Sequence, residues 1–302
     1  MKSSEMVVLA DATRLDRARE IWDGSPVDAI EWPGDVVDGG RLLKDEFGRG
    51  RRLFVVFGGD DLAGRVTTAY RRRGDLGSRP LKIWPLDVGT SFLAADKDGV
   101  DPARAAKLTK KPIEDWRRRQ VGTLKVSAST EPAAWYGFSF GAGWIYRATE
   151  SRKRARGGSK NFFSAYGRLA TETLTGDDDR PVALRVAVDH RPVDEASGSM
   201  IASTLQKTMF GLGAGGDGAV VWEGVPTSTL VRRGLTPEVL DRSDVGGERF
   251  DSLHLDSPEG WFLDGRLHGS DDPGVVQIVP GPTVTVMQPQ VGLRAAVRGL
   301  LN

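Results

Sequence analysis

The chain lacks cysteine altogether and has only three histidines, His190, His254 and His268, in 302 residues. The lack of cysteine excludes disulfides, thiolate nucleophiles and cysteine metal sites. Three histidines in unrelated contexts argue against a Ser-His-Asp centre or a histidine metal site. No apolar run approaches the roughly 18 residues of a membrane-spanning helix, and the first residues do not form a signal peptide. We therefore expect a globular, cytoplasmic protein.

An excess of one charge is lacking as well, because 42 Lys and Arg residues balance 41 Asp and Glu residues. Basic residues still cluster, above all in residues 147–160, which include Gly157-Gly158. Aromatic residues are not interleaved with these charges, which argues against a nucleic-acid partner. The segment fits peripheral contact with an anionic membrane surface, and a solvated basic loop is the alternative.

Glycine is abundant, with 38 residues, as expected for many turns between short elements. In the first part of the chain, apolar strand-like runs alternate with stretches of helical spacing. This βαβ pattern predicts a doubly wound α/β domain with a parallel sheet, covering residues 1–122. The expected strands are residues 7–10, 27–32, 53–57 and 81–84, and the expected helices are residues 14–21, 40–47, 62–73 and 102–119.

The pattern changes after residue 122 to short strands separated by turns, which predicts a mostly antiparallel β-sandwich over residues 123–290. One amphipathic helix is expected at 159–174, and a C-terminal helix at 291–302 is expected to pack back on the first domain. The expected strands are residues 124–128, 135–140, 182–188, 200–205, 229–231, 252–255, 275–279 and 283–287, with a turn at Pro280-Gly281-Pro282.

Two glycine turns carry the most specific signal. Gly58-Gly59 follows the apolar run 53–57, and Gly89-Thr90 follows the apolar run 81–86. A strand, a glycine turn and a helix N-terminus together bring backbone N–H groups to an anion without interference from a Cβ atom. Two such turns at neighbouring carboxyl ends of a parallel sheet predict a phosphate-binding site.

With these turns in place, the chain resembles the diacylglycerol-kinase-like catalytic family of lipid kinases. That family includes sphingosine kinases and shares its nucleotide-binding fold with NAD kinases. Its members carry a GGDGT turn, then P-L-G-T-x-N-D, and a late D-G-E motif in a β-rich second domain. This chain has GGDD at 58–61, PLDVGT at 85–90 and LDGR at 263–266.

The resemblance implies ATP-dependent, Mg²⁺-assisted phosphotransfer to a lipid-like alcohol in a cleft between two domains. It implies that Asp60 orients Mg²⁺ or the reacting group, and that Asp264 is the general base. For Asp264 the alternative is a turn residue before Gly265. A metal role is considered for Asp217, with an exposed loop as the alternative. The residues implied to contact the nucleotide phosphates are Gly58, Gly59, Asp61, Gly89 and Thr90. Asp61 would make this contact across a cation.

Several positions depart from the family pattern. Asp61 and Leu62 replace Gly and Thr of GGDGT, residues 91–94 read SFLA in place of Asn-Asp, and Arg266 replaces the glutamate of D-G-E. Residues 11–14, Asp-Ala-Thr-Arg, follow the first strand where the family has N-P-x-S-G. Each change touches nucleotide or metal chemistry. The alternative function is therefore a catalytically inactive pseudokinase or a nucleotide- or lipid-binding protein. The sequence leaves the acceptor and the oligomeric state open.

Overall fold

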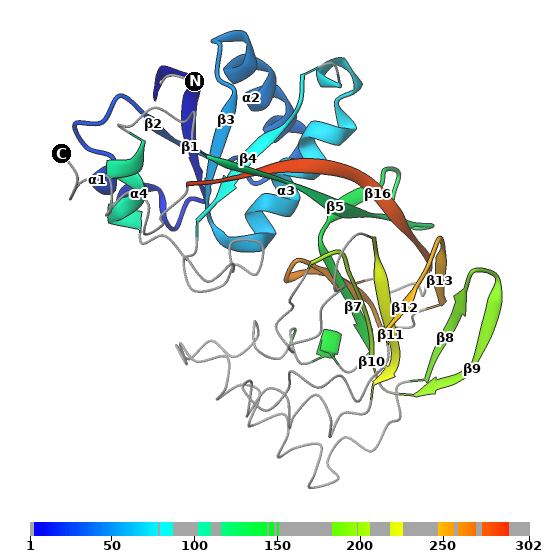
Figure 1. The fold of residues 1–302 in the computed structure, drawn as a ribbon. Coiled ribbons are helices and arrows are strands. Elements are labelled where there is room, and N and C mark those ends of the chain that lie inside the picture. Colours follow the sequence, from blue (N-terminus) through cyan, green and yellow to red (C-terminus); the bar gives the residue numbers. More distant parts are fainter. Residues whose placement is uncertain are drawn as a thin grey trace, which may run out of the picture. The chain divides into compact units, whose positions relative to one another are not determined.

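The structure, a computed structural model, divides into two compact units (Figure 1): residues 1–121 with 283–302, and residues 122–282. Two long strands, β5 (Arg117–Ala128) and β16 (Val275–Gln288), contribute residues to both units. The residues that the structure describes are 3–77, 79–86, 102–109, 116–143, 145–147, 150, 183–197, 199–205, 218–225, 247–256, 259–269 and 274–289.

The first unit is built on a parallel sheet in the order β2-β1-β3-β4, which the C-terminal half of β16 extends beyond β4. From β1 the chain passes to β2 on one side and then to β3 and β4 on the other. This doubly wound arrangement confirms the predicted fold, and its switch point lies between β1 and β3. The strands are β1 (Met6–Ala10), β2 (Asp28–Glu31), β3 (Leu53–Phe57) and β4 (Lys82–Pro85).

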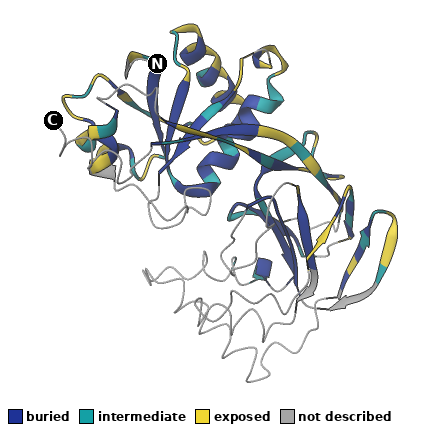
Figure 2. Ribbon diagram, in the orientation of Figure 1, coloured by how far each residue is buried: buried dark blue, intermediate teal, exposed yellow. Residues whose placement is uncertain are grey.

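Helices pack on both faces of this sheet. One face packs with α1 (Leu15–Ile21) and α4 (Pro102–Leu108), whose apolar side chains share a core with Val8 and Val55. Successive strand residues point to opposite faces, so Phe54 faces the other way and meets Phe47 of α2 (Val36–Gly48) with ring centroids 5.0 Å apart. Helix α3 (Gly59–Arg72) packs beside α2. Figure 2 shows the resulting burial along the strands.

Two helix boundaries differ from the sequence prediction. Helix α2 begins at Val36 rather than residue 40, because Asp35 caps it by accepting hydrogen bonds from the N–H groups of Val37 and Asp38. Helix α4 ends at Leu108, and Arg117–Ala128 is strand β5 rather than the end of a helix. The arginines of this strand lie on its exposed or half-buried positions, and β5 pairs with β16, from far along the sequence.

The second unit is a sandwich of two sheets, as predicted. One sheet has the order β12-β11-β10-β7-β14-β15, and the other contains β16-β13-β8-β9 with β5 paired to β16 and β6. All pairs within the first of these sheets are antiparallel. The remaining strands are β6 (Trp135–Gly137), β7 (Ser139–Gly143), β8 (Ala183–Val188), β9 (Arg191–Ser197), β10 (Ser199–Ser203), β11 (Val220–Val225), β12 (Glu248–Arg249), β13 (Leu253–Asp256), β14 (Trp261–Leu263) and β15 (Arg266–His268).

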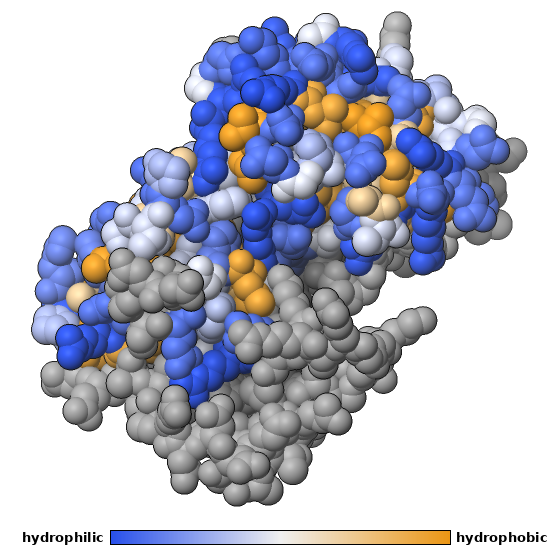
Figure 3. Space-filling view, turned by 180° about the vertical axis from the view of Figure 1, so that it is seen from behind, coloured by the Kyte–Doolittle hydropathy of each residue, from blue (hydrophilic) through white to orange (hydrophobic). Residues whose placement is uncertain are grey.

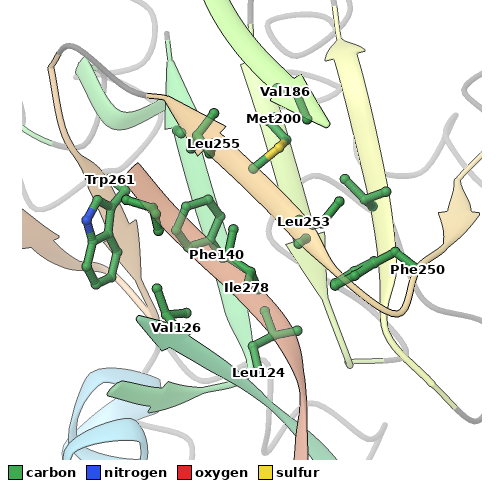
Figure 4. Close-up of a cluster of buried hydrophobic side chains, with 14 of the residues drawn as sticks. Leu124, Val126, Phe140, Val186, Met200, Phe250, Leu253, Leu255, Trp261 and Ile278 are labelled. Carbon is green, nitrogen blue, oxygen red and sulfur yellow. The ribbon is translucent and has the colours of Figure 1, made fainter. Parts of the chain in front are cut away.

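The core of the second unit lies between these sheets (Figure 4). Phe140, Met200 and Trp261 come from one sheet, and Leu253 and Ile278 come from the other. Every one of these side chains is at most 5% exposed. Alternate strand residues therefore meet across the two inner faces, as in other β-sandwiches.

On the face shown in Figure 3, hydrophilic side chains cover most of the described surface, and apolar ones gather on part of the first unit.

Strand β16 runs through Pro280-Gly281-Pro282 without the turn that we predicted there. The hydroxyl of Thr123 on β5 donates to the carbonyl of Pro282 at 2.7 Å. A Cβ atom on Gly281 would lie only 2.4 Å from the same hydroxyl oxygen, so glycine lets β5 approach here. The predicted helices at 159–174 and 291–302 and the predicted strand at 229–231 lie outside the described residues.

Candidate functional site

The first predicted turn lies at the carboxyl end of β3. Gly59 has φ +77°, a left-handed conformation that favours glycine. A Cβ atom on Gly58 would lie 2.5 Å from Cδ2 of Leu62, so the turn closes tightly on the first turn of α3. Both glycines are therefore needed for the chain to pass from strand to helix within two residues.

Helix α3 presents its N-terminus at this turn. Its first turn contains Asp60 and Asp61, which complement the positive end of the helix dipole. Asp60 is buried, with 7% of its surface exposed. Asp61 is more exposed and forms an ion pair with Arg65 one helical turn later, with Oδ2 and Nη2 3.3 Å apart. The two carboxylates therefore have different surroundings, although they are adjacent in the sequence.

A second loop follows β1. Asp11 accepts hydrogen bonds from the hydroxyl of Thr13 and from the guanidinium of Arg14, both at 2.5 Å. The backbone N–H of Arg14 also donates to the carbonyl of Asp11 at 2.9 Å. These contacts make a compact loop, in which a carboxylate and a guanidinium neutralise one another.

The two loops are neighbours at the topological switch point. Ala10 pairs with Phe57 in the parallel register, so the loops leave the sheet side by side. The carboxylate oxygen Oδ2 of Asp11 lies 3.1 Å from the place that a Cβ atom of Gly58 would take. Crevices at this point of doubly wound sheets bind ligands. Asp11, Thr13 and Arg14 were not predicted as site residues, and their place directly after the first strand is the signal that could have identified them.

The second predicted turn begins at the end of β4. Pro85 pairs with Val56 of β3, and the N–H of Leu86 donates to the carbonyl of Val56 at 3.0 Å. The structure thus places the start of the segment 85–90 beside the end of β3. Gly89 and Thr90 lie outside the described residues, as does Asp217.

Asp264 lies in the second unit, at the turn between β14 and β15. It has φ +53° and is followed by Gly265 at φ +86°. Its Oδ1 accepts the N–H groups of Phe138 at 2.9 Å and Ser139 at 2.8 Å. These hydrogen bonds fix the turn between β14 and β15 against the backbone of Phe138 and Ser139. These contacts also explain why residues 135–140, predicted as one strand, form β6 and β7 with a break at Phe138.

Arg266 and His268 follow on β15, at alternate positions that share one face of the strand. The guanidinium carbon of Arg266 lies 4.6 Å from the centre of the Trp135 ring. His268 stacks on Trp261 with ring centroids 3.7 Å apart, and its Nδ1 lies 3.1 Å from Oε1 of Glu131. The face of β15 therefore carries a guanidinium and an imidazole held against two tryptophans.

The residues that the structure describes contain no group of three His, Asp or Glu side chains able to hold a metal ion by themselves. Mg²⁺ is commonly bound by one or two carboxylates together with substrate phosphates, and the first turn of α3 offers carboxylates of that kind. Across the same described ranges, no helix combines the length and the apolar character needed to cross a bilayer.

No protein-family profile and no curated protein matches the chain. Solved structures do match. A structure of a putative diacylglycerol kinase from Bacillus anthracis str. Sterne aligns with a TM-score of 0.60, covering 94% of this chain and 95% of that one. A structure of a diacylglycerol kinase from the same organism aligns with a TM-score of 0.55, covering 94% of this chain and 97% of that one, and both are 14% identical to this chain. Yeast NADH kinase complexed with NADH aligns with a TM-score of 0.51 at 10% identity, covering 98% of this chain and 87% of that one. The predicted resemblance is thus confirmed in the fold, which this chain shares with diacylglycerol-kinase-like proteins and NADH kinase.

Proposed function

We propose that the chain is a phosphotransferase that uses ATP to phosphorylate a lipid-like alcohol. The observation that carries this proposal is the glycine turn Gly58-Gly59 at the switch point between β1 and β3, beside the N-terminus of α3. Backbone N–H groups and a helix dipole at such a turn bind phosphate. The shared fold with a diacylglycerol kinase and an NADH kinase supports nucleotide use and an alcohol acceptor.

In this proposal the protein acts mainly by positioning and by neutralising charge. Gly58, Gly59, Gly89 and Thr90 hold the phosphates through N–H and hydroxyl groups, and Arg14 adds a guanidinium beside them. Asp60 orients Mg²⁺, which when bound neutralises phosphate charge, and Asp217 is a further proposed metal ligand. Asp61 meets the nucleotide only with a cation between them.

Asp264 is the proposed proton acceptor for the alcohol. The proton passes from the hydroxyl to a carboxylate oxygen of Asp264 while the alcohol oxygen attacks the γ-phosphorus and ADP leaves. Oδ1 accepts the N–H groups of Phe138 and Ser139, whereas of these two Oδ2 accepts only that of Phe138, at 3.1 Å, so Oδ2 is the oxygen assigned to this step.

A second candidate function is binding without turnover. The observation that favours it is the carboxylate of Asp11, which lies beside Gly58 and forms an ion pair with Arg14. With Asp60 and Asp61 in the adjacent helical turn, the site carries more negative charge than a triphosphate site favours. A pseudokinase could then retain a nucleotide or a lipid and lack transfer.

Calorimetric titration with ATP, with and without Mg²⁺, tests the proposal before any acceptor is known. We expect Mg²⁺-dependent binding, which Asp60→Ala weakens while the fold stays intact. Asp16→Ala is the matched control, because Asp16 lies in the first turn of α1 with its side chain fully exposed. No binding of ATP at millimolar concentration, or equal affinity in Asp60→Ala, would contradict this assignment. Binding with no phosphate transfer to any alcohol would favour the pseudokinase.

Contact of the basic segment 147–160 with an anionic membrane is a separate proposal. Each basic residue near an anionic surface contributes about 1 kcal/mol, and salt screens this attraction. We expect the protein to sediment with vesicles that contain anionic lipid and to be released as salt is raised. Equal binding to neutral vesicles would rule out this contact.

A further inference from the structure

The strand position of Arg266 is fixed by the turn that precedes it. Asp264 and Gly265 take positive φ angles, and the Asp264 carboxylate is bound to the backbone of Phe138 and Ser139. Strand β15 begins at the next residue, with Arg266 paired to Leu263. The backbone that carries Arg266 is therefore held at the turn by the hydrogen bonds from two backbone N–H groups to the Asp264 carboxylate, and beyond the turn by the pairing with β14.

The side chain of Arg266 rests on a platform that is itself fixed. Its guanidinium carbon lies 4.6 Å from the Trp135 ring centre, within the range of a cation–π contact. The indole N–H of Trp135 donates to Glu131 Oε2, and the ring also meets His268 edge-on with centroids 4.8 Å apart. A guanidinium held over a ring still has its N–H donors in its own plane, where they can form paired hydrogen bonds to an anion.

The charge of this group is not neutralised by a carboxylate in the described part of the chain. Arg147 and Arg191 of the same unit form ion pairs with Glu259 and Glu248, whereas Arg266 forms none with a described residue. The arginine stands where the family that the sequence resembles has the glutamate of D-G-E. The motif position therefore carries a positive charge in place of a negative one.

We propose that Arg266 binds an anionic group of the acceptor, so that the acceptor is an alcohol carrying a phosphate rather than a neutral diacylglycerol. This inference rests on the proposed function and names its substrate class. The Trp135 ring holds the guanidinium in place. The acceptor phosphate supplies the anion that Glu259 and Glu248 supply to Arg147 and Arg191. A phosphate on a lipid headgroup and a phosphate on a small soluble alcohol share this chemistry.

Binding measurements on the full chain test the proposal. Glycerol 3-phosphate is titrated by calorimetry, and phosphatidylcholine vesicles are prepared with phosphatidylglycerol, with diacylglycerol or with neither. The variants are Arg266→Glu, which restores the charge of the family motif, and Arg266→Lys, which keeps the charge but not the planar fork. Arg249→Glu is the matched control, because Arg249 is an exposed strand arginine of the same unit.

We expect the wild-type protein to bind at least one phosphate-bearing probe, and Arg266→Glu to weaken that binding about tenfold or more. Arg266→Lys should fall between the two, and Arg249→Glu should match the wild type. If Arg266→Glu weakens the binding of glycerol 3-phosphate, the acceptor is a soluble alcohol. If it weakens only the binding of phosphatidylglycerol vesicles, the acceptor is a lipid.

Three results would overturn the proposal: no binding of either phosphate-bearing probe, equal affinity in Arg266→Glu, or binding to diacylglycerol vesicles alone. Titration of the same preparation with Mg-ATP distinguishes a failure of this inference from a failure of the proposed function. If ATP binds and Arg266 has no effect, the acceptor class is wrong and the nucleotide site stands. If the wild type does not bind ATP, the proposed function itself is wrong.

Discussion

The Asp264 carboxylate is hydrogen-bonded to the backbone N–H of Phe138, with Oδ1 2.9 Å and Oδ2 3.1 Å from the nitrogen. This contact joins two segments that lie more than a hundred positions apart in the sequence. We expect Asp264→Ala to destabilise the second unit by about 2 to 3 kcal/mol, because buried N–H groups lose their acceptor. Urea unfolding with tryptophan fluorescence measures the loss.

Asp264→Asn separates this structural contact from proton transfer. Asparagine keeps a side-chain acceptor and tolerates positive φ, so we expect a loss of about 1 kcal/mol or less. The asparagine amide cannot act as a general base, so this variant loses the proton acceptor completely. An Asn variant that folds and transfers phosphate at the wild-type rate would remove Asp264 as the general base and leave it as a structural residue.

Replacing Asp61 with glycine restores the family residue at that position. The change removes a carboxylate from the α3 N-terminus and releases Arg65 from its ion pair. We expect Mg-ATP affinity to rise by about two- to tenfold, with a stability cost of about 0.5 to 1 kcal/mol for glycine in a helix. Calorimetry measures the affinity. An unchanged affinity in both Asp61→Gly and Asp61→Asn would place the triphosphate away from this turn.

Arg51 anchors the amino-terminal edge of the first sheet. Its guanidinium donates to the carbonyls of Ser4 and Met6 at 2.7 and 2.9 Å, and lies 3.5 Å from the carboxylate of Glu46, which is 2% exposed. We expect Arg51→Met to cost about 3 kcal/mol, because a buried carboxylate loses one of its cations.

The matched control for Arg51 is Arg41→Met, which breaks an exposed helical pair with Asp38 and should cost about 0.5 kcal/mol or less. A double variant with Glu46→Met should recover part of the loss, since no buried charge then remains. Equal unfolding midpoints for Arg51→Met and Arg41→Met would show that the Glu46 contact contributes nothing.

The turn between β8 and β9 carries a carboxylate whose contacts depend on pH. The N–H groups of Ser252 and Asp251 hold the pKa of Asp189 below its ordinary value. A carboxyl whose folded pKa is lowered stabilises the protein above its unfolded pKa of about 3.9, and this contribution is lost as the pH falls through the folded pKa. Wild type should therefore lose more stability than Asp189→Asn between about pH 6 and about pH 3. Parallel loss in urea titrations of the two proteins would contradict this.

Much of the first unit could be predicted from the sequence because β1 and β3 are short, continuous apolar runs, followed by Asp11 and Gly58. Local spacing then identified α1 and α3 to within a few residues. Strand β5 could not be predicted in the same way. The run Arg117-Arg118-Arg119 has no local strand signal, and its conformation depends on pairing with β16, from far along the chain.

The candidate site shows the same limit. Gly58 and Gly59 were predicted from their place after an apolar strand, and the structure places both at the carboxyl end of β3. Asp11 and Arg14 were seen only as a missing motif, because their nearness to Gly58 follows from β1 and β3 being neighbours in the sheet. Trp135 was not connected with Arg266, since that contact joins two strands well separated in the chain.

The return of β16 to the first unit has a consequence for synthesis on the ribosome. The strand that completes the parallel sheet, residues 283–288, is translated about two hundred positions after β4. Translation adds roughly 5 to 20 residues per second, so one edge of β4 stays unpaired for tens of seconds. Residues 122–282 can emerge and fold during that interval. A ribosome that stalls before residue 283 would therefore leave a nascent chain whose sheet edge is available to chaperones or to other chains.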